Sequence, residues 1–65
     1  MNTEDIYDQK RTRIGKIVTH SDGNQDIYDV RGSRLGQYRR NEDRTYDVRG
    51  AAIGFGNQLM RLLNG

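Results

Sequence analysis

The residues most suggestive of chemistry are the neighbours His20, Ser21 and Asp22, whose side chains are the types found in serine-hydrolase triads. A triad requires three side chains to converge in a fixed geometry. Adjacent residues in a turn rarely reach that arrangement, so we expect His20 to be a solvated turn residue. The sequence offers no catalytic residue, and we predict that the protein is not an enzyme.

A metal site has one candidate, a set of aspartates that each follow a tyrosine: Asp8, Asp29 and Asp47. Hard cations prefer several oxygen ligands, which three converging carboxylates would supply. The alternative is that each carboxylate accepts backbone N–H groups in the turn beside it. We favour the turn role, and the sequence leaves open whether the three side chains converge.

Composition removes several other kinds of site. The chain has no Cys and one His, which excludes a thiol nucleophile, a disulfide and a zinc finger. No glycine-rich phosphate loop precedes a helix. We therefore expect no metal, no cofactor and no small-molecule substrate.

The clearest binding signal is arginine interleaved with tyrosine, since nine of the eleven basic residues are Arg. From Asp26 to Arg49 there are six basic and five acidic residues, which leaves a net charge of +1. The side chains best suited to contact a partner are Arg31, Arg34, Tyr38, Arg39, Arg40, Arg44 and Arg49.

Two classes of partner fit these residues. Arg and aromatic side chains on a curved sheet can hold single-stranded nucleic acid, although such proteins usually have a clearer basic excess. Arg and Tyr are also enriched at the hot spots of protein interfaces. We predict a non-catalytic protein-binding module, with nucleic-acid binding as the alternative. The two differ in whether the arginines share one face free of Asp and Glu.

The protein partner is either a second copy or a different protein. A 65-residue chain without disulfides often needs a partner subunit for stability, so we expect a homo-oligomer. Self-association would use apolar side chains near the C-terminus: Ile53, Phe55, Leu59, Leu62 and Leu63. The more specific form is an inhibitor of a larger host complex, as small phage and mobile-element proteins with anti-defence roles often are.

The N-terminal residues 1–13 are polar and lack the apolar region of a secretory signal. No apolar stretch approaches the roughly 20 residues that span a bilayer. We expect a single domain, residues 1–65, in the cytoplasm.

One pattern occurs three times, in residues 6–17, 27–38 and 45–56. Tyr, Asp, an Ile or Leu, and a Gly recur at the same offsets, with tyrosines 21 and then 18 residues apart. Each copy predicts a β-hairpin whose polar turn contains Gly32 or Gly50. Arg11 occupies that turn position in the first copy, so the first turn differs in type or is strained.

A second glycine recurs inside the second arm of each hairpin: Gly15, Gly36 and Gly54. Such a glycine marks a bulge, a bend or a close backbone approach. Repeated bending curls a sheet, so we predict an all-β domain curled into a small barrel- or flower-like form. The segment 57–65 predicts a short helix with Asn57 as its N-cap. The expected core contains Ile6, Tyr7, Ile14, Ile17, Ile27, Tyr28, Val30, Leu35, Tyr46, Val48, Ile53 and Leu62.

Residues 6–56 resemble the repeats of the four-fold β-flower proteins, small bacterial domains, in the pattern Tyr-Asp-x-x-Gly-x-x-Ile/Leu-Gly. They resemble less closely the YD repeats of Rhs-type toxin shells, where Arg stands at the positions of Ser33 and Ala51. The resemblance implies a β-hairpin repeat fold and no particular activity. Because three copies are present, either the C-terminal segment closes the fold or another subunit supplies the missing element.

Overall fold

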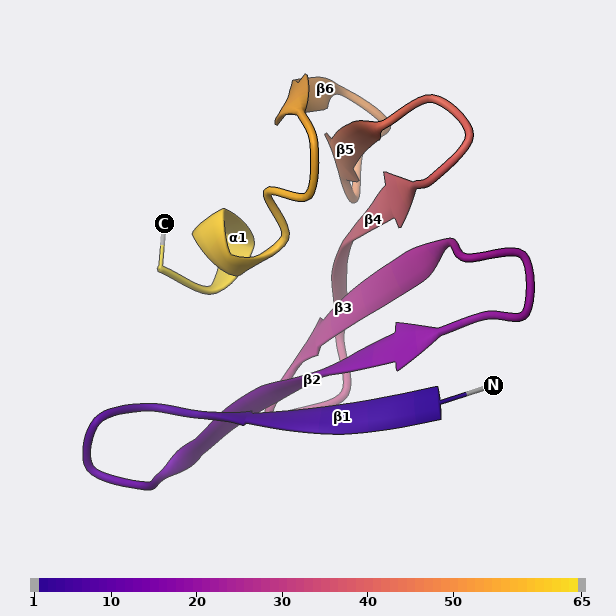
Figure 1. The fold of residues 1–65 in the computed structure, drawn as a ribbon. Coiled ribbons are helices and arrows are strands. Elements are labelled where there is room, and N and C mark those ends of the chain that lie inside the picture. The colour runs from indigo at the N-terminus through magenta and orange to yellow at the C-terminus, as the bar shows by residue number, and fades with distance from the viewer. Residues whose placement is uncertain (1, 65) are drawn as a thin grey trace.

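Six antiparallel strands form one sheet in chain order (Figure 1). The structure is a computed structural model that describes residues 2–64. Its elements are β1 (Asn2–Tyr7), β2 (Arg13–Thr19), β3 (Gln25–Asp29), β4 (Arg34–Arg39), β5 (Arg44–Asp47), β6 (Ala52–Phe55) and α1 (Met60–Asn64). The predicted all-β fold of three hairpins with a short C-terminal helix is confirmed. The sheet is curled but open, because β1 and β6 form its two edges and do not pair with each other.

The turn of each hairpin is built on the repeated aspartate. Asp29 Oδ1 accepts the backbone N–H groups of Arg31 and Ser33, both at 2.9 Å. Asp8 and Asp47 bind the equivalent N–H groups of their own turns at distances between 2.8 and 3.0 Å. The turn role expected for these carboxylates is confirmed.

The first turn keeps the conformation of the other two although it carries Arg11 at the glycine position. The φ angle is +65° at Arg11, +88° at Gly32 and +87° at Gly50. A left-handed backbone costs an L-residue roughly 1–2 kcal/mol, so strain is the outcome at Arg11.

Arg11→Gly is expected to raise the free energy of unfolding by about 1 kcal/mol, because glycine adopts a positive φ without a steric penalty. The midpoint of urea unfolding measures the change. Lys10→Gly is the matched control in the same turn, at a residue whose φ is not positive. We expect the control to lose stability, and a similar loss for Arg11→Gly would contradict the strain.

A β-bulge occurs at the same place in every hairpin. Ile6 pairs with Gly15 while Tyr7 pairs with Arg13, so Ile14 is the extra residue. The register skips Leu35 and Ile53 in the same way in the other two hairpins. Because a bulge bends its strand and increases the local twist, three equivalent bulges help to curl the sheet. Of the three features that the recurrent glycine was predicted to mark, a bulge, a bend or a close backbone approach, the bulge is found in every hairpin.

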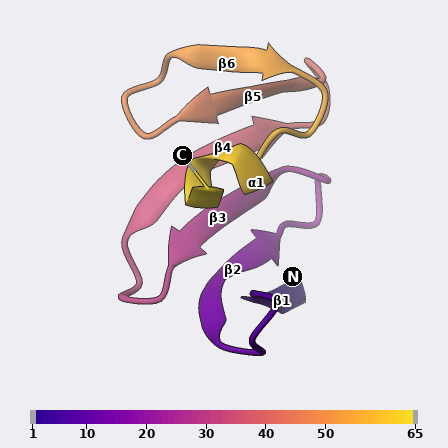
Figure 2. The same ribbon diagram turned by 90° about the vertical axis from the view of Figure 1, so that its left-hand side faces the viewer.

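The helix α1 lies against the face of the sheet that carries Gly15 and Gly36, in front of β3 and β4 in Figure 2. A Cβ on Gly36 would overlap with the carbonyl oxygen of Tyr46 and with the Leu62 side chain. A Cβ on Gly15 would overlap with the carbonyl oxygen of Tyr28 and meet Leu63 Cδ2 at 3.1 Å. These two glycines therefore leave room for the next strand and for the leucines of the helix.

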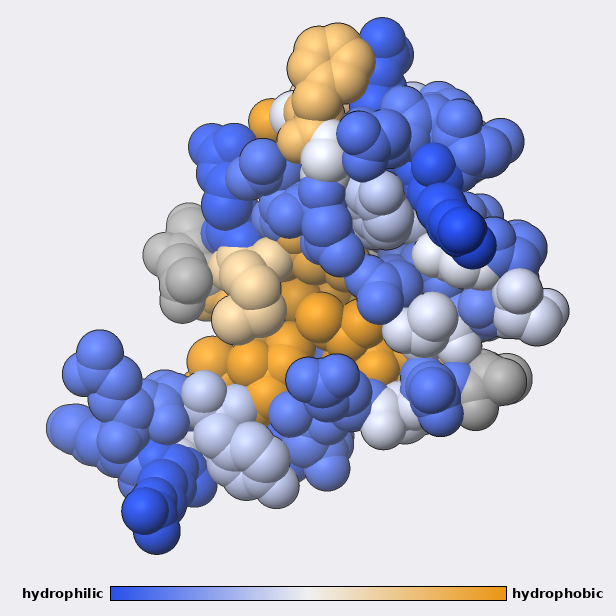
Figure 3. Space-filling model, in the orientation of Figure 1, coloured by the Kyte–Doolittle hydropathy of each residue, from blue (hydrophilic) through white to orange (hydrophobic). Residues whose placement is uncertain are grey.

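The core lies between α1 and the curled sheet, where Figure 3 shows apolar side chains gathered. Ile27 and Leu59 are fully buried. Thr45 is also fully buried, and its hydroxyl accepts the Gln58 backbone N–H at 2.8 Å and donates to the Gly56 carbonyl at 2.7 Å. These bonds fix the segment that leads into the helix.

Three residues predicted for the core are exposed: Tyr7 (56%), Val30 (55%) and Val48 (61%). Val30 and Val48 follow the turn aspartate, so they lie in the turn rather than on the strand. Tyr7 lies on β1, which has no strand beyond it among residues 2–64. The other predicted core residues are buried or half-buried.

The helix begins later than predicted, at Met60, and it has five residues. Asn57 is not its N-cap but closes the preceding turn, where its Oδ1 accepts the Leu59 backbone N–H at 3.2 Å. The end of the predicted segment, residue 65, lies outside the described residues. Within the part of the chain that is described, no helix is long and apolar enough to cross a membrane.

Candidate functional site

The sheet face opposite α1 carries most of the charged and aromatic strand residues, and we call it the open face. Gly15 and Gly36 point toward α1, so their neighbours Lys16 and Gln37 point the other way. Residues paired across antiparallel strands share a face, and the observed register then defines the set. The polar, charged and aromatic residues of the open face on β2 to β6 are Lys16, Asp26, Tyr28, Arg34, Gln37, Arg39, Arg44, Tyr46 and Phe55, and the register adds Val18 and Ala52.

Three cationic side chains of the open face lie over aromatic rings. Such a contact contributes about 0.5–1 kcal/mol at an exposed site, and it holds a long side chain against the sheet. The distances from the cationic group to the ring centroid are 5.3 Å for Lys16 and Tyr28, 5.2 Å for Arg39 and Tyr46, and 4.8 Å for Arg44 and Phe55.

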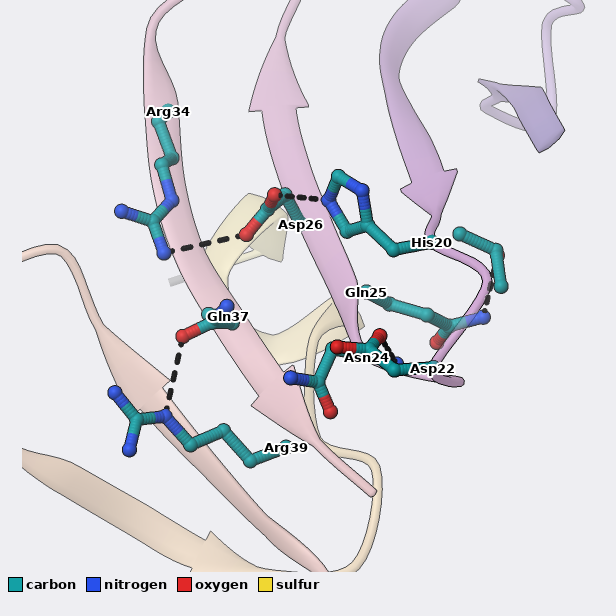
Figure 4. A network of polar contacts seen from close by, with 9 residues as sticks. His20, Asp22, Asn24, Gln25, Asp26, Arg34, Gln37 and Arg39 are labelled. Atoms are coloured by element: carbon teal, nitrogen blue, oxygen red, sulfur yellow. Dashed lines mark hydrogen bonds and ion pairs between the residues drawn. The ribbon is translucent and has the colours of Figure 1, made fainter. Parts of the chain in front are cut away.

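Two acidic side chains, Asp26 and Glu42, each pair with an arginine of the open face. Asp26 is 8% exposed, and its carboxylate lies between two partners (Figure 4). Its Oδ2 is 2.6 Å from His20 Nε2, and its Oδ1 is 3.2 Å from Arg34 Nη2. Asp22 instead accepts the Asn24 backbone N–H at 2.9 Å. His20, Ser21 and Asp22 therefore do not form a triad.

Glu42, in the turn between β4 and β5, likewise pairs with an arginine of the open face. Its Oε1 accepts a short hydrogen bond from the Tyr46 hydroxyl, and its Oε2 lies 3.2 Å from Arg39 Nη1. These hydrogen bonds, the one from Tyr46 first, hold the pKa of Glu42 below its usual value. The carboxylate is thus kept ionised beside Arg39, and the two charges offset each other.

The seven residues predicted to contact a partner separate into two groups. Arg34, Arg39 and Arg44 come together on the open face. The other four are elsewhere: Tyr38 on the α1 face beside Thr45, Arg40 beside the β2–β3 turn, and Arg31 and Arg49 in hairpin turns.

Tyr38 and Arg40 have local partners. The Tyr38 hydroxyl donates to Asp43 Oδ1 at 2.8 Å, a hydrogen bond that raises the pKa of Tyr38. The Arg40 backbone N–H donates to Asn24 Oδ1 at 3.0 Å. The first hydrogen bond links β4 to the β4–β5 turn, and the second links that turn to the β2–β3 turn.

The prediction of an apolar self-association surface near the C-terminus is wrong in part. Leu59 is fully buried within the chain, and Leu62 and Leu63 are half-buried against the sheet. Phe55 is 71% exposed and remains available.

Sequence reasoning also missed three polar or charged members of the open face: Lys16, Asp26 and Gln37. Alternation along the strands would have found all three, once the strand boundaries and bulges were known.

The three repeated aspartates lie in separate turns and do not converge. Each uses Oδ1 for backbone N–H groups of its own turn. Within residues 2–64, no three His, Cys, Asp or Glu side chains are grouped closely enough to hold a metal ion.

A shallow hollow of about 290 Å³ lies on the open face beside Tyr46. Its lining combines guanidinium, amide, phenol and carboxylate groups with an exposed valine: Arg34, Gln37, Arg39, Tyr46, Asp47, Val48 and Gly50. The hollow therefore offers hydrogen-bond donors and acceptors of both charge signs next to apolar surface.

Comparison of the chain with protein-family models, with curated proteins and with solved structures finds no match.

Proposed function

We propose that this chain is a non-catalytic cytoplasmic protein-binding module whose open face contacts another protein. One observation carries the proposal: Arg39 lies over the Tyr46 ring and is paired with Glu42 at the rim of the hollow. Arg and Tyr are enriched at interface hot spots, where they are held in well-packed positions. Such a face suits a partner that is a larger complex, which the chain would inhibit or join.

The charge arrangement favours a protein over a nucleic acid. Arg34, Arg39 and Arg44 share the open face, but acidic side chains contact that face as well. Asp26 offsets Arg34, and Glu42 offsets Arg39. Both carboxylates would repel phosphates, whereas a protein surface of mixed charge can match donors and acceptors of both signs.

Preorganisation gives a further argument. Ordering a rotamer-rich side chain at an interface costs about 0.5–1.5 kcal/mol. Arg39 and Lys16 already lie over aromatic rings in the free chain, so binding a partner would reduce the freedom of these two side chains less than that of unrestrained ones.

The test is affinity capture of the tagged chain from native lysate, with washes at low and at high salt. The eluate is assayed for proteins and for nucleic acid, and the affinity of a recovered protein is then measured for two variants. Arg39→Ala removes the stacked arginine of the open face. Arg49→Ala removes an exposed arginine from a hairpin turn and is the control with an identical change in charge.

A protein that survives high salt, binds Arg39→Ala about tenfold more weakly and binds Arg49→Ala normally supports the proposal. If the recovered protein bound the two variants with equal affinity, Arg39 of the open face would not contribute to the interface, and the proposal would be contradicted. Nucleic acid that is recovered at low salt and lost at high salt would establish the alternative, because phosphate contacts weaken steeply with salt. An empty eluate in both washes would also overturn the proposal.

A further inference from the structure

The pairing between successive hairpins follows one rule. Where the first hairpin meets the second, Gly15 pairs with Asp29 and Lys16 with Tyr28. Where the second meets the third, Gly36 pairs with Asp47 and Gln37 with Tyr46. The recurrent strand glycine therefore pairs with the recurrent aspartate of the next hairpin, and the residue after that glycine pairs with the tyrosine.

Within residues 2–64 the third hairpin has the same edge, and no further hairpin pairs with it. By the rule, Gly54 would pair with the repeat aspartate of a next hairpin, and Phe55 with its tyrosine. The first hairpin has the opposite free edge: within the described residues, no strand pairs with the outer side of β1, where Tyr7 and Asp8 are the equivalents of the paired tyrosine and aspartate. The free edges of β6 and β1 are thus equivalent to the two strand edges that pair between successive hairpins, a pairing that the chain already makes twice.

The exposed aromatic rings mark these edges. Tyr28 and Tyr46, which face a preceding strand, are half-buried. Tyr7 is 56% exposed and Phe55 is 71% exposed. In the single chain, Tyr7 and Phe55 lack the cross-strand neighbour that the pairing rule would give them.

Gly54 gives an independent observation. A Cβ on Gly15 or Gly36 would overlap with the carbonyl oxygen of the tyrosine on the next strand. At Gly54 the nearest heavy atom is Gln58 Cγ at 3.4 Å, an ordinary contact. The single chain therefore gives no steric reason for glycine at this position, whereas a following strand at the same distance would supply one.

We infer that β6 of one copy pairs with β1 of a second copy, with Gly54 opposite Asp8 and Phe55 opposite Tyr7 of that copy. The contact is head-to-tail, so copies add until a ring closes or continue as a filament. This inference deepens the self-association expected of a small binding module. It uses the two edges of the sheet, and Phe55 is the residue that the β6 edge shares with the open face.

The chemistry of the edges fits head-to-tail pairing better than pairing of like edges. β1 carries Glu4 and Asp5, and Asp5 is paired with Arg13 of β2 at 3.0 Å. Beside β6, Arg44 and Arg61 contact Phe55 and Ile53. Two β1 edges would bring carboxylates together, and two β6 edges would bring arginines together. At the free edge of β6 the Phe55 carbonyl accepts Gln58 Nε2 at 3.1 Å, an exposed bond that a strand N–H would replace.

The test measures the mass of the purified chain against concentration by sedimentation, so it can fail independently of partner capture. The wild type is expected to assemble, and Tyr7→Lys and Phe55→Lys are each expected to stay monomeric. Val48→Lys is the matched control, because Val48 is 61% exposed but lies in a turn. Gly54→Ala should remain folded by circular dichroism and assemble about tenfold more weakly.

Mixing the two edge variants distinguishes the kinds of contact. Phe55 of the Tyr7→Lys chain meets the intact Tyr7 of the Phe55→Lys chain, so one normal junction re-forms and the mixture yields a pair of chains. If only Phe55→Lys blocked assembly, two β6 edges would be in contact and the inference would be wrong. A wild type that stays monomeric at every concentration, or edge variants that assemble normally, would overturn it as well.

Discussion

Gly36→Ala is expected to lower the free energy of unfolding by about 3 kcal/mol, the upper range for forcing a methyl group into packed space. The new Cβ would overlap with the carbonyl oxygen of Tyr46 on the paired strand and with Leu62 of α1. The leucine can rotate, but the carbonyl belongs to the β4–β5 ladder. A domain of this size has a total stability of roughly 3–10 kcal/mol, so the variant loses a large part of it. Thermal and urea unfolding followed by circular dichroism measure the loss.

Gly54→Ala is the control at the same position of the repeat. No heavy atom lies closer than 3.4 Å to its Cβ, and strand glycines lose about 0.5–1 kcal/mol relative to alanine. Measured at a concentration that keeps the chain monomeric, its stability should be unchanged or slightly higher. Equal losses at Gly36 and Gly54 would show that these glycines are needed for the bend itself and not for close approach.

The turns were predictable because their chemistry is local. Asp29, Gly32 and the residues between them contain the whole turn: one carboxylate, the N–H groups it accepts and one positive φ. Three copies of the same pattern then predicted three hairpins. The bulge beside each strand glycine was likewise implied by its repetition.

The exposure of the repeated residues was not predictable from the repeat, because it depends on neighbours. Tyr7, Tyr28 and Tyr46 share one offset, yet Tyr7 is exposed since no strand lies beyond β1. Val30 was assigned to a strand because it is β-branched. The turn that Asp29 organises already includes Val30, and this local hydrogen bonding outweighs the β-propensity of valine.

The open face required knowledge of the register. Each bulge shifts one strand by a residue, so a count of alternating positions along β4 does not show that Arg34 lies beside Asp26. The sequence shows six basic and five acidic residues from Asp26 to Arg49, and only the sheet shows which of them neutralise each other. This pairing of charges, which only the fold shows, is the ground on which a protein partner is proposed rather than a nucleic acid.

The position of α1 accounts for the open sheet. Closure into a barrel would require β6 to reach β1 of the same chain, whereas α1 fills the concave side of the sheet and packs against Gly15 and Gly36. The sequence left two alternatives, closure by the C-terminal segment or an element from another subunit. α1 covers a face of the sheet and leaves both edges unpaired, an arrangement compatible with the second alternative.

Leu59→Ala is expected to lower the free energy of unfolding by about 3 kcal/mol, within the range for truncating a fully buried leucine. Leu59 is 0% exposed and precedes α1, a helix too short to be stable without tertiary packing. Its loss should therefore also free α1 and increase the binding of a dye specific for exposed apolar surface. Met60→Ala, at a neighbour that is 44% exposed, should cost less than about 1 kcal/mol and leave dye binding unchanged. Similar losses for the two variants, measured by urea unfolding, would mean that Leu59 does not anchor the helix to the sheet.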